Sequence, residues 1–177
     1  MRPASLKTLV SVANAVDSFS EYCGRAVSWL VLAMVLLVGY DVTMRYVFRS
    51  GSIALQELEW HLFSIIFLAG AAYTLKHDAH VRLDLFYQSK RLTDRHRAWI
   101  NLAGDLLFLI PFCILIIVSV WPFLYQSYLY AEGSPDPGGL PYRWLLKAMI
   151  PVGFAMLIVQ GLGNACRNIA RLLERDT

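Results

Sequence analysis

Four long apolar blocks constrain the fold of this chain more than any other feature. They occupy about residues 26–48, 54–75, 98–125 and 142–164, and a helix needs roughly 20 apolar residues to cross a bilayer. In the second block the apolar run from Leu62 to Leu75 is shorter than this, so Glu57 and Glu59 before it are expected at membrane depth and in need of partners. In lipid, every backbone polar group must be paired within the spanning structure, so only helices and closed barrels can cross. The blocks do not alternate with a period of two, which excludes a barrel. The sequence therefore predicts an all-α integral membrane protein, a single four-helix membrane domain over residues 1–177.

The composition agrees with a membrane location, and the residues before the first block follow a helical pattern. Charged residues make up 16% of the chain, against about 25% in typical soluble domains. Apolar residues recur every three or four positions, at Leu6, Leu9, Val10, Ala13, Val16 and Phe19. This spacing predicts an amphipathic helix over residues 1–25 that lies in the membrane interface before the chain turns inward. The alternative is a disordered tail.

The distribution of basic residues predicts the orientation. Twelve of the 16 Lys and Arg residues fall in the two tails and in the connection at residues 76–97, and four fall on the other side of the membrane. Basic residues are enriched in cytoplasmic segments of membrane proteins. We therefore expect both termini and the connection at 76–97 to be cytoplasmic, and residues 49–53 and 126–141 to face outward.

Charged residues gather near the outer ends of the predicted helices. They are Asp41, Arg45, Glu57, Glu59, Arg143 and Lys147. Charges at membrane depth usually face the bundle interior or a partner, and Asp41 and Arg45 are spaced four apart, which permits a pair on one helical face. We therefore expect a structural polar layer, formed by Asp41, Arg45, Glu57, Glu59 and Lys147, that ties the first, second and fourth helices together. The alternative is that these groups surround the bilayer rim in water.

The connection before the last helix is rich in proline and glycine. Proline disfavours helix in the residue before it, and glycine permits positive φ, so residues 132–143 should form an irregular but restricted loop. Pro141 is well placed to open the last helix. Such a shape suits contact with a partner, and we expect Ser134, Asp136 and Arg143 to take part in docking. The alternative is a plain turn.

A second polar cluster follows the second apolar block. His77, Asp78, His80 and Asp84 could be metal ligands, but zinc normally requires four ligands at fixed geometry, and Lys76 and Arg82 lie among them. Polar and apolar residues alternate in this cluster, which indicates a segment at the membrane interface. We expect cytoplasmic-side pinning contacts rather than a metal site, from His77, His80, Arg82, Asp84 and Asp105.

The sequence does not indicate an enzyme. It has no nucleophile–base arrangement, no glycine-rich phosphate loop and no H-E-x-x-H motif. A haem held by two histidines needs them at matching depth on facing helices, and His61 is the histidine within an apolar block. We expect no cofactor, and a haem- or quinone-binding four-helix anchor of a respiratory enzyme remains the alternative. A third reading is a small exporter that works as a homo-oligomer.

Six short motifs carry a resemblance to a known family. They are RYVF at 45–48, QELEW at 56–60, LAGAAYTL at 68–75, HDAHVRLD at 77–84, EGSPDPGGLP at 132–141 and RWLLK at 143–147. Together they resemble the DctQ-type small membrane subunit of tripartite ATP-independent periplasmic (TRAP) transporters, over about residues 26–163. The motif at 132–141 is similar to the branch for mannitol/chloroaromatic compounds or 2-oxo acids.

The resemblance implies a role in a complex of the bacterial inner membrane. A large membrane subunit would carry the substrate and sodium sites and move as an elevator, and a periplasmic binding protein would deliver the substrate. This chain would brace the large subunit, help to dock the binding protein and contact membrane lipids, without a catalytic or nucleic-acid-binding role. The solute is not indicated by the sequence.

Overall fold

The computed structural model describes residues 4–77 and 93–174, and the regular structure within these ranges is helical. The elements are α1 (Ala4–Tyr46), α2 (Ile53–Lys76), α4 (Asp94–Ala103), the π-helix η1 (Gly104–Leu109), α5 (Ile110–Leu129) and α6 (Trp144–Glu174). Four spans are long and apolar enough to cross a membrane: Leu6–Tyr46, Ile53–Lys76, Asp94–Leu129 and Trp144–Leu173. The predicted all-α fold with four spanning helices is confirmed.

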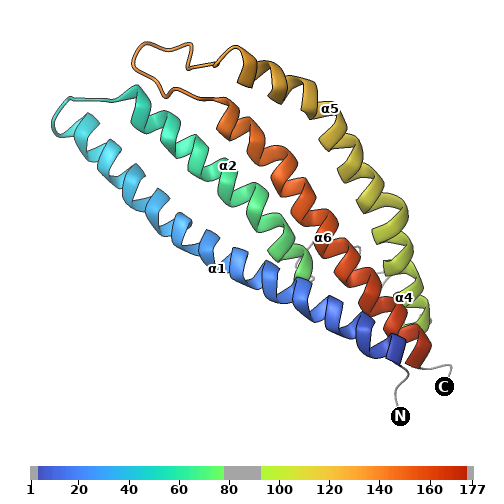
Figure 1. Cartoon of the computed structure of the whole chain (residues 1–177). Coiled ribbons are helices and arrows are strands. Elements are labelled where there is room, and N and C mark those ends of the chain that lie inside the picture. Colours follow the sequence, from blue (N-terminus) through green and yellow to red (C-terminus); the bar gives the residue numbers. More distant parts are fainter. Residues whose placement is uncertain (1–3, 78–92, 175–177) are drawn as a thin grey trace.

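Helix α6 lies at the centre of the bundle. It packs against α1, α2, α4, η1 and α5, and α1 also packs against α2. Figure 1 shows the long helices side by side, with α2 and α6 between α1 and α5. The start of α1 and the end of α6 lie together at one end of the bundle, and the connection between α5 and α6 lies at the other. The topology therefore separates the chain termini from the proline-rich connection.

Helix α1 is longer than the sequence pattern predicts. It runs without interruption through 43 residues, or about 64 Å, whereas the hydrocarbon core of a bilayer is about 30 Å thick. The expected turn near residue 26 is absent, because this half of the helix contains no proline and its polar side chains find partners on other helices. Ser20 contacts Gln160 of α6, and Glu21 contacts Lys76 of α2. The interfacial location of residues 1–25 stays a prediction.

The third spanning segment contains a π-helical turn that the sequence pattern does not predict. In η1 the backbone N–H of Ile110 donates to the carbonyl of Asp105, five residues back. Pro111 follows at the start of α5. Proline lacks an N–H and its ring clashes with the carbonyl four residues earlier, so a wider turn before it relieves the clash. The π-turn thus accommodates the proline within a helix that continues to Leu129.

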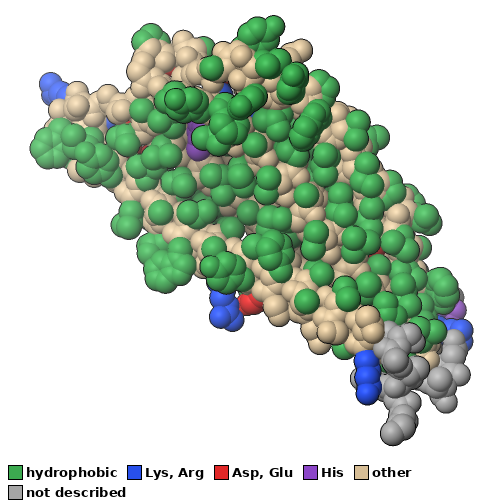
Figure 2. All heavy atoms as spheres, viewed as in Figure 1, with side chains coloured by type: hydrophobic (Ala, Val, Ile, Leu, Met, Phe, Trp, Pro, Cys, Tyr) green, Lys and Arg blue, Asp and Glu red, His purple; other side chains and the backbone are tan. Residues whose placement is uncertain are grey.

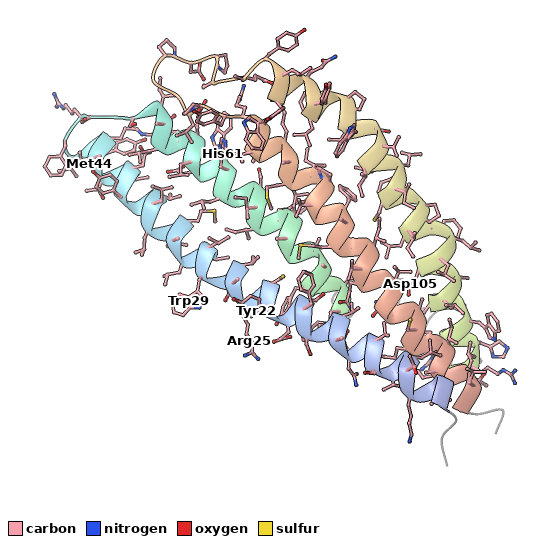
Figure 3. The ribbon with its side chains drawn as sticks, in the orientation of Figure 1. Tyr22, Arg25, Trp29, Met44, His61 and Asp105 are labelled. Atoms are coloured by element: carbon pink, nitrogen blue, oxygen red, sulfur yellow. The ribbon has the colours of Figure 1, made fainter. Side chains whose placement is uncertain are left out.

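Most large apolar side chains point away from the bundle. Trp29 is 72% exposed, Phe67 68% and Phe108 74%, and Figure 2 shows hydrophobic side chains over most of the face in view. Tyr22, Arg25 and Trp29 project from α1 away from the other helices (Figure 3). Apolar surface of this extent indicates contact with lipid or with another protein.

Candidate functional site

The connection between α5 and α6 has a closed shape of its own. It is here called the outer loop (residues 130–143), after the outward orientation that the basic residues predict. The amide of Ser134 donates to the carbonyl of Leu140 at 3.0 Å, and that of Arg143 donates to the carbonyl of Glu132 at 2.9 Å. Within the tip, Gly139 donates to Asp136 at 3.0 Å. These backbone bonds join the two arms of the loop, so its shape is defined before any partner binds.

Glu57 of α2 binds the outer loop through hydrogen bonds. Its side chain is buried, and each of its carboxylate oxygens accepts a hydrogen bond from the loop. Ser134 Oγ donates to Oε1, and the amide of Leu140 donates to Oε2 at 2.6 Å. A Cβ atom at Gly139 would clash with Ser134 Oγ and lie 2.8 Å from Glu57 Oε2, so this position has no room for a larger residue. Although Glu57 lies on α2, both of its carboxylate oxygens are thus bonded to the loop.

Lys147 of α6 holds the same loop from its other side. Its ammonium donates to the carboxylate of Glu132, at the start of the loop, and lies 3.7 Å from the centre of the Phe123 ring. The hydrogen bond from Lys147 lowers the pKa of Glu132 below its ordinary value. Charge patterns did not single out Glu132, although it opens the proline-rich motif and precedes Lys147 by 15 positions.

Removing the Lys147 ammonium is expected to loosen the loop in a pH-dependent way. A Lys147→Met variant removes the ammonium that donates to Glu132, its main cationic neighbour. Because the folded-state pKa of Glu132 lies below its ordinary 4.5, the pair stabilises the fold above pH 4.5, and this contribution is lost as the pH falls through the lowered pKa. The purified variant should melt at a lower temperature than the wild type near neutral pH, and the difference should close in acid. A difference that does not vary with pH would contradict this role.

The other members of the predicted polar layer do not tie helices together directly. Arg45 donates to Asp41 within α1, as their spacing permits. The second oxygen of Asp41 and one oxygen of Glu59 are buried without a hydrogen-bond partner among the described residues. Neither Glu57 nor Glu59 makes an ion pair with Lys147, which is paired with Glu132 instead. The contacts of the described residues thus pair Asp41 with Arg45 inside α1 and bond Glu57 and Lys147 to the loop, while one oxygen each of Asp41 and Glu59 has no hydrogen-bond partner there.

The residues predicted for the docking loop are partly used within the loop itself. Ser134 accepts from the amide of Asp136 at 3.1 Å while it donates to Glu57. The Asp136 side chain is exposed, and that of Arg143 is half-buried. His61 lies beneath this region on α2 (Figure 3) and its Nδ1 lies 2.6 Å from the carbonyl of Glu57. Asp136 therefore remains available to a partner, whereas Ser134 shapes the loop.

Toward the opposite end of the bundle, the carboxylate of Glu21 on α1 contacts three basic side chains. Lys76 Nζ donates to it at 2.5 Å, Arg25 Nε donates at 3.2 Å, and His77 Nε2 lies 3.2 Å away. The sequence pattern indicated His77 but not Glu21, which lies far away along the chain. Asp105, half-buried, is the second residue of η1 (Figure 3). The other residues predicted to pin this side, His80, Arg82 and Asp84, lie outside the described residues.

A buried polar network joins α1 to α6, and charge patterns did not predict it. Gln160 is fully buried and accepts from Ser20 Oγ at 2.6 Å. Its amide nitrogen donates to Asp17 at 3.1 Å and to Asn164 at 3.2 Å, and Arg167 donates to the other oxygen of Asp17. Gln160, Asn164 and Arg167 recur every three or four residues on one helical face, which is the signal that could have found them.

Comparison with known proteins places this architecture in a family. Residues 34–171 match the family described as tripartite ATP-independent periplasmic transporters, DctQ component. The chain is 25% identical to the C4-dicarboxylate TRAP transporter small permease protein DctQ of Vibrio cholerae, over 186 aligned positions that cover 93% of this chain and 77% of the relative. The four apolar helices agree with a multi-pass membrane subunit, and a transporter component of this kind is not an enzyme. The chain belongs to the DctQ component family of tripartite ATP-independent periplasmic transporters.

Proposed function

We propose that this chain is the stationary small subunit of a sodium-coupled importer of organic acids, where it braces a large membrane subunit and helps to dock a periplasmic binding protein. The observation that carries the proposal is the fixed attachment of α6 to its neighbours. Gln160 and Arg167 of α6 are hydrogen-bonded to Ser20 and Asp17 of α1 in the buried network. A support that holds its shape while another subunit moves needs cross-ties of this kind.

Close helix packing supports the same role. Three glycines of α6 allow neighbouring helices to approach so closely that an added Cβ would meet their atoms within 2.9 Å. These contacts are Gly153 with Leu68 of α2, Gly161 with Leu109 of η1, and Gly163 with Val16 of α1. Glycine at these points lets the neighbouring helices pack directly against the backbone of α6, and van der Waals packing of this kind is a main source of cohesion between helices in lipid.

The proposed partners follow from the exposed surface and the family. The bundle leaves large apolar side chains uncovered on α1, α2 and α5, enough to contact both lipid and a large membrane subunit. The family is defined as one component of a tripartite transporter, and the relative named for C4-dicarboxylates supports an organic acid as solute. The excess of Lys and Arg in the tails supports cytoplasmic termini, which would place the outer loop on the periplasmic side.

Reconstitution of the transporter tests the proposal. Liposomes would contain the large subunit with or without this chain, together with the binding protein, an inward sodium gradient and a labelled dicarboxylate. We expect sodium-dependent uptake with both subunits and little or none with the large subunit alone. Uptake at the full rate by the large subunit alone would show that the brace is unnecessary.

A further inference from the structure

We infer that Glu57 is a positioning residue that sets the shape of the surface on which the periplasmic binding protein docks. The inference rests on the docking part of the proposed function and adds the group that controls it. Glu57 is 2% exposed, so it cannot itself form much of the contact with a soluble partner. Its effect on docking must therefore act through the residues that it holds.

One carboxylate fixes both arms of the outer loop to α2. Ser134 and Leu140 lie on opposite arms, and each donates to a different oxygen of Glu57. The arms are also joined to each other by the bond from the Ser134 amide to the Leu140 carbonyl. An ionised carboxylate is a pure acceptor and can receive both donors at once, whereas an amide would present an N–H₂ group to one of them. The chemistry of the site thus favours a carboxylate.

Backbone strain on both flanks of the loop is an independent sign of a built surface. Ala131 has a φ of 45° and Tyr142 a φ of 62°. Residues other than glycine adopt this region at an energetic cost, and they persist there only when the surrounding structure enforces it. The two positions bracket the segment that Glu57 holds. The contacts around the loop must therefore enforce the backbone conformation at both flanks.

The strained flanks present aromatic side chains to the solvent. Tyr130 is 81% exposed and Tyr142 57%, and the exposed Asp136 lies between them along the chain. Tyrosine is enriched at the centres of protein–protein interfaces because it gives a large contact area with few rotatable bonds. A rigid loop bearing two tyrosines and one acid fits a folded protein partner. Because the distribution of basic residues predicts that the loop faces outward, the periplasmic component of the tripartite transporter is the partner that this surface fits.

The test uses the complex of this chain with its large subunit in nanodiscs, and measures the affinity of the binding protein by surface plasmon resonance. A Glu57→Leu variant keeps the volume of the side chain but removes both acceptors. We expect affinity to fall at least about tenfold, because the partner must then order the loop on binding. The affinity should fall less in Glu57→Gln, because the glutamine oxygen can still accept from the Leu140 amide. Glu59→Gln is the matched control, since it removes a carboxylate two residues away that makes no bond to the loop.

Hydrogen exchange at the Leu140 amide separates the possible outcomes. We expect faster exchange in Glu57→Leu, with co-purification of the large subunit unchanged. Unchanged exchange, or faster exchange with unchanged affinity, would overturn the inference. If replacing residues 133–140 by a glycine–serine linker leaves affinity unchanged, the docking proposal itself fails. Should Glu57→Leu not assemble, Ser134→Ala removes one of the two bonds from the loop side and must lower affinity for the inference to stand.

Discussion

A Gly153→Val variant is expected to destabilise the helix bundle strongly, because it forces two packed helices apart. A Cβ atom at this position would lie 2.9 Å from Leu68 Cβ and 3.0 Å from the Leu68 carbonyl oxygen. The obstacle is backbone of α2, which cannot rotate away as a flexible side chain could. Overpacking of this kind typically costs about 1–3 kcal/mol, and occasionally more. The thermal unfolding of the purified subunit in detergent measures the effect.

A control at Gly39 isolates the contact from the general effect of valine in a helix. Gly39 lies on an exposed face of α1, and an added Cβ there meets nothing within 4 Å. Gly39→Val changes helix propensity in the same way but creates no clash. We therefore expect a clear fall in melting temperature for Gly153→Val and almost none for Gly39→Val. Equal shifts in the two variants would mean that α2 and α6 do not approach as closely as the structure shows.

The close approach at Gly153 matters for function because Leu68 and Glu57 belong to the same helix. Gly153 sets the distance between α6 and α2, and the outer loop is bonded to both helices, through Lys147 and Glu57. A shift of α6 relative to α2 would therefore pull the two anchors of the loop apart. The Gly153→Val variant is expected to weaken binding of the periplasmic protein as well as stability, whereas Glu57→Leu should affect binding with little loss of assembly.

The fold was predictable from the sequence because the membrane requirement depends on local properties. The length of an apolar run and the absence of period-two alternation are sufficient to predict spanning helices. The Asp41–Arg45 pair was predictable for the same reason, since its partners are four residues apart on one helix. The length of α1 was not predictable from hydropathy, because the turn expected near residue 26 is prevented by contacts with other helices.

The hydrogen-bond partners of Glu57 could not be predicted from the pattern of charges. Opposite signs suggested a layer with Lys147, yet the acceptors of Glu57 are filled by a hydroxyl and a backbone amide, 77 and 83 positions away. Neutral donors leave no charge pattern in a sequence. The same holds for Gln160, whose partner Ser20 lies 140 positions away. The prolines and glycines were sufficient to indicate the loop, but not the buried acid on another helix that shapes it.

A Gln160→Leu variant is expected to loosen the attachment of α1 to α6. The substitution keeps a similar volume but leaves Ser20, Asp17 and Asn164 without their bonds to the amide. Interhelical hydrogen bonds in membrane proteins average about 0.6 kcal/mol and reach about 1.7, so the loss of the two bonds to α1 should cost about 1–3 kcal/mol. The readouts are thermal unfolding in detergent and hydrogen exchange of the backbone amides in the first half of α1.

Gln126→Leu serves as the matched control for this change, because Gln126 is exposed on α5. The same substitution there removes an amide from the surface, and both readouts should stay close to those of the wild type. If Gln160→Leu behaves like Gln126→Leu, the buried network does not hold α1 in place. The first half of α1 would then be free to lie along the membrane separately from the bundle. Faster hydrogen exchange in the first half of α1 in Gln160→Leu alone would instead show that one buried amide keeps a 43-residue helix fixed to the centre of the subunit.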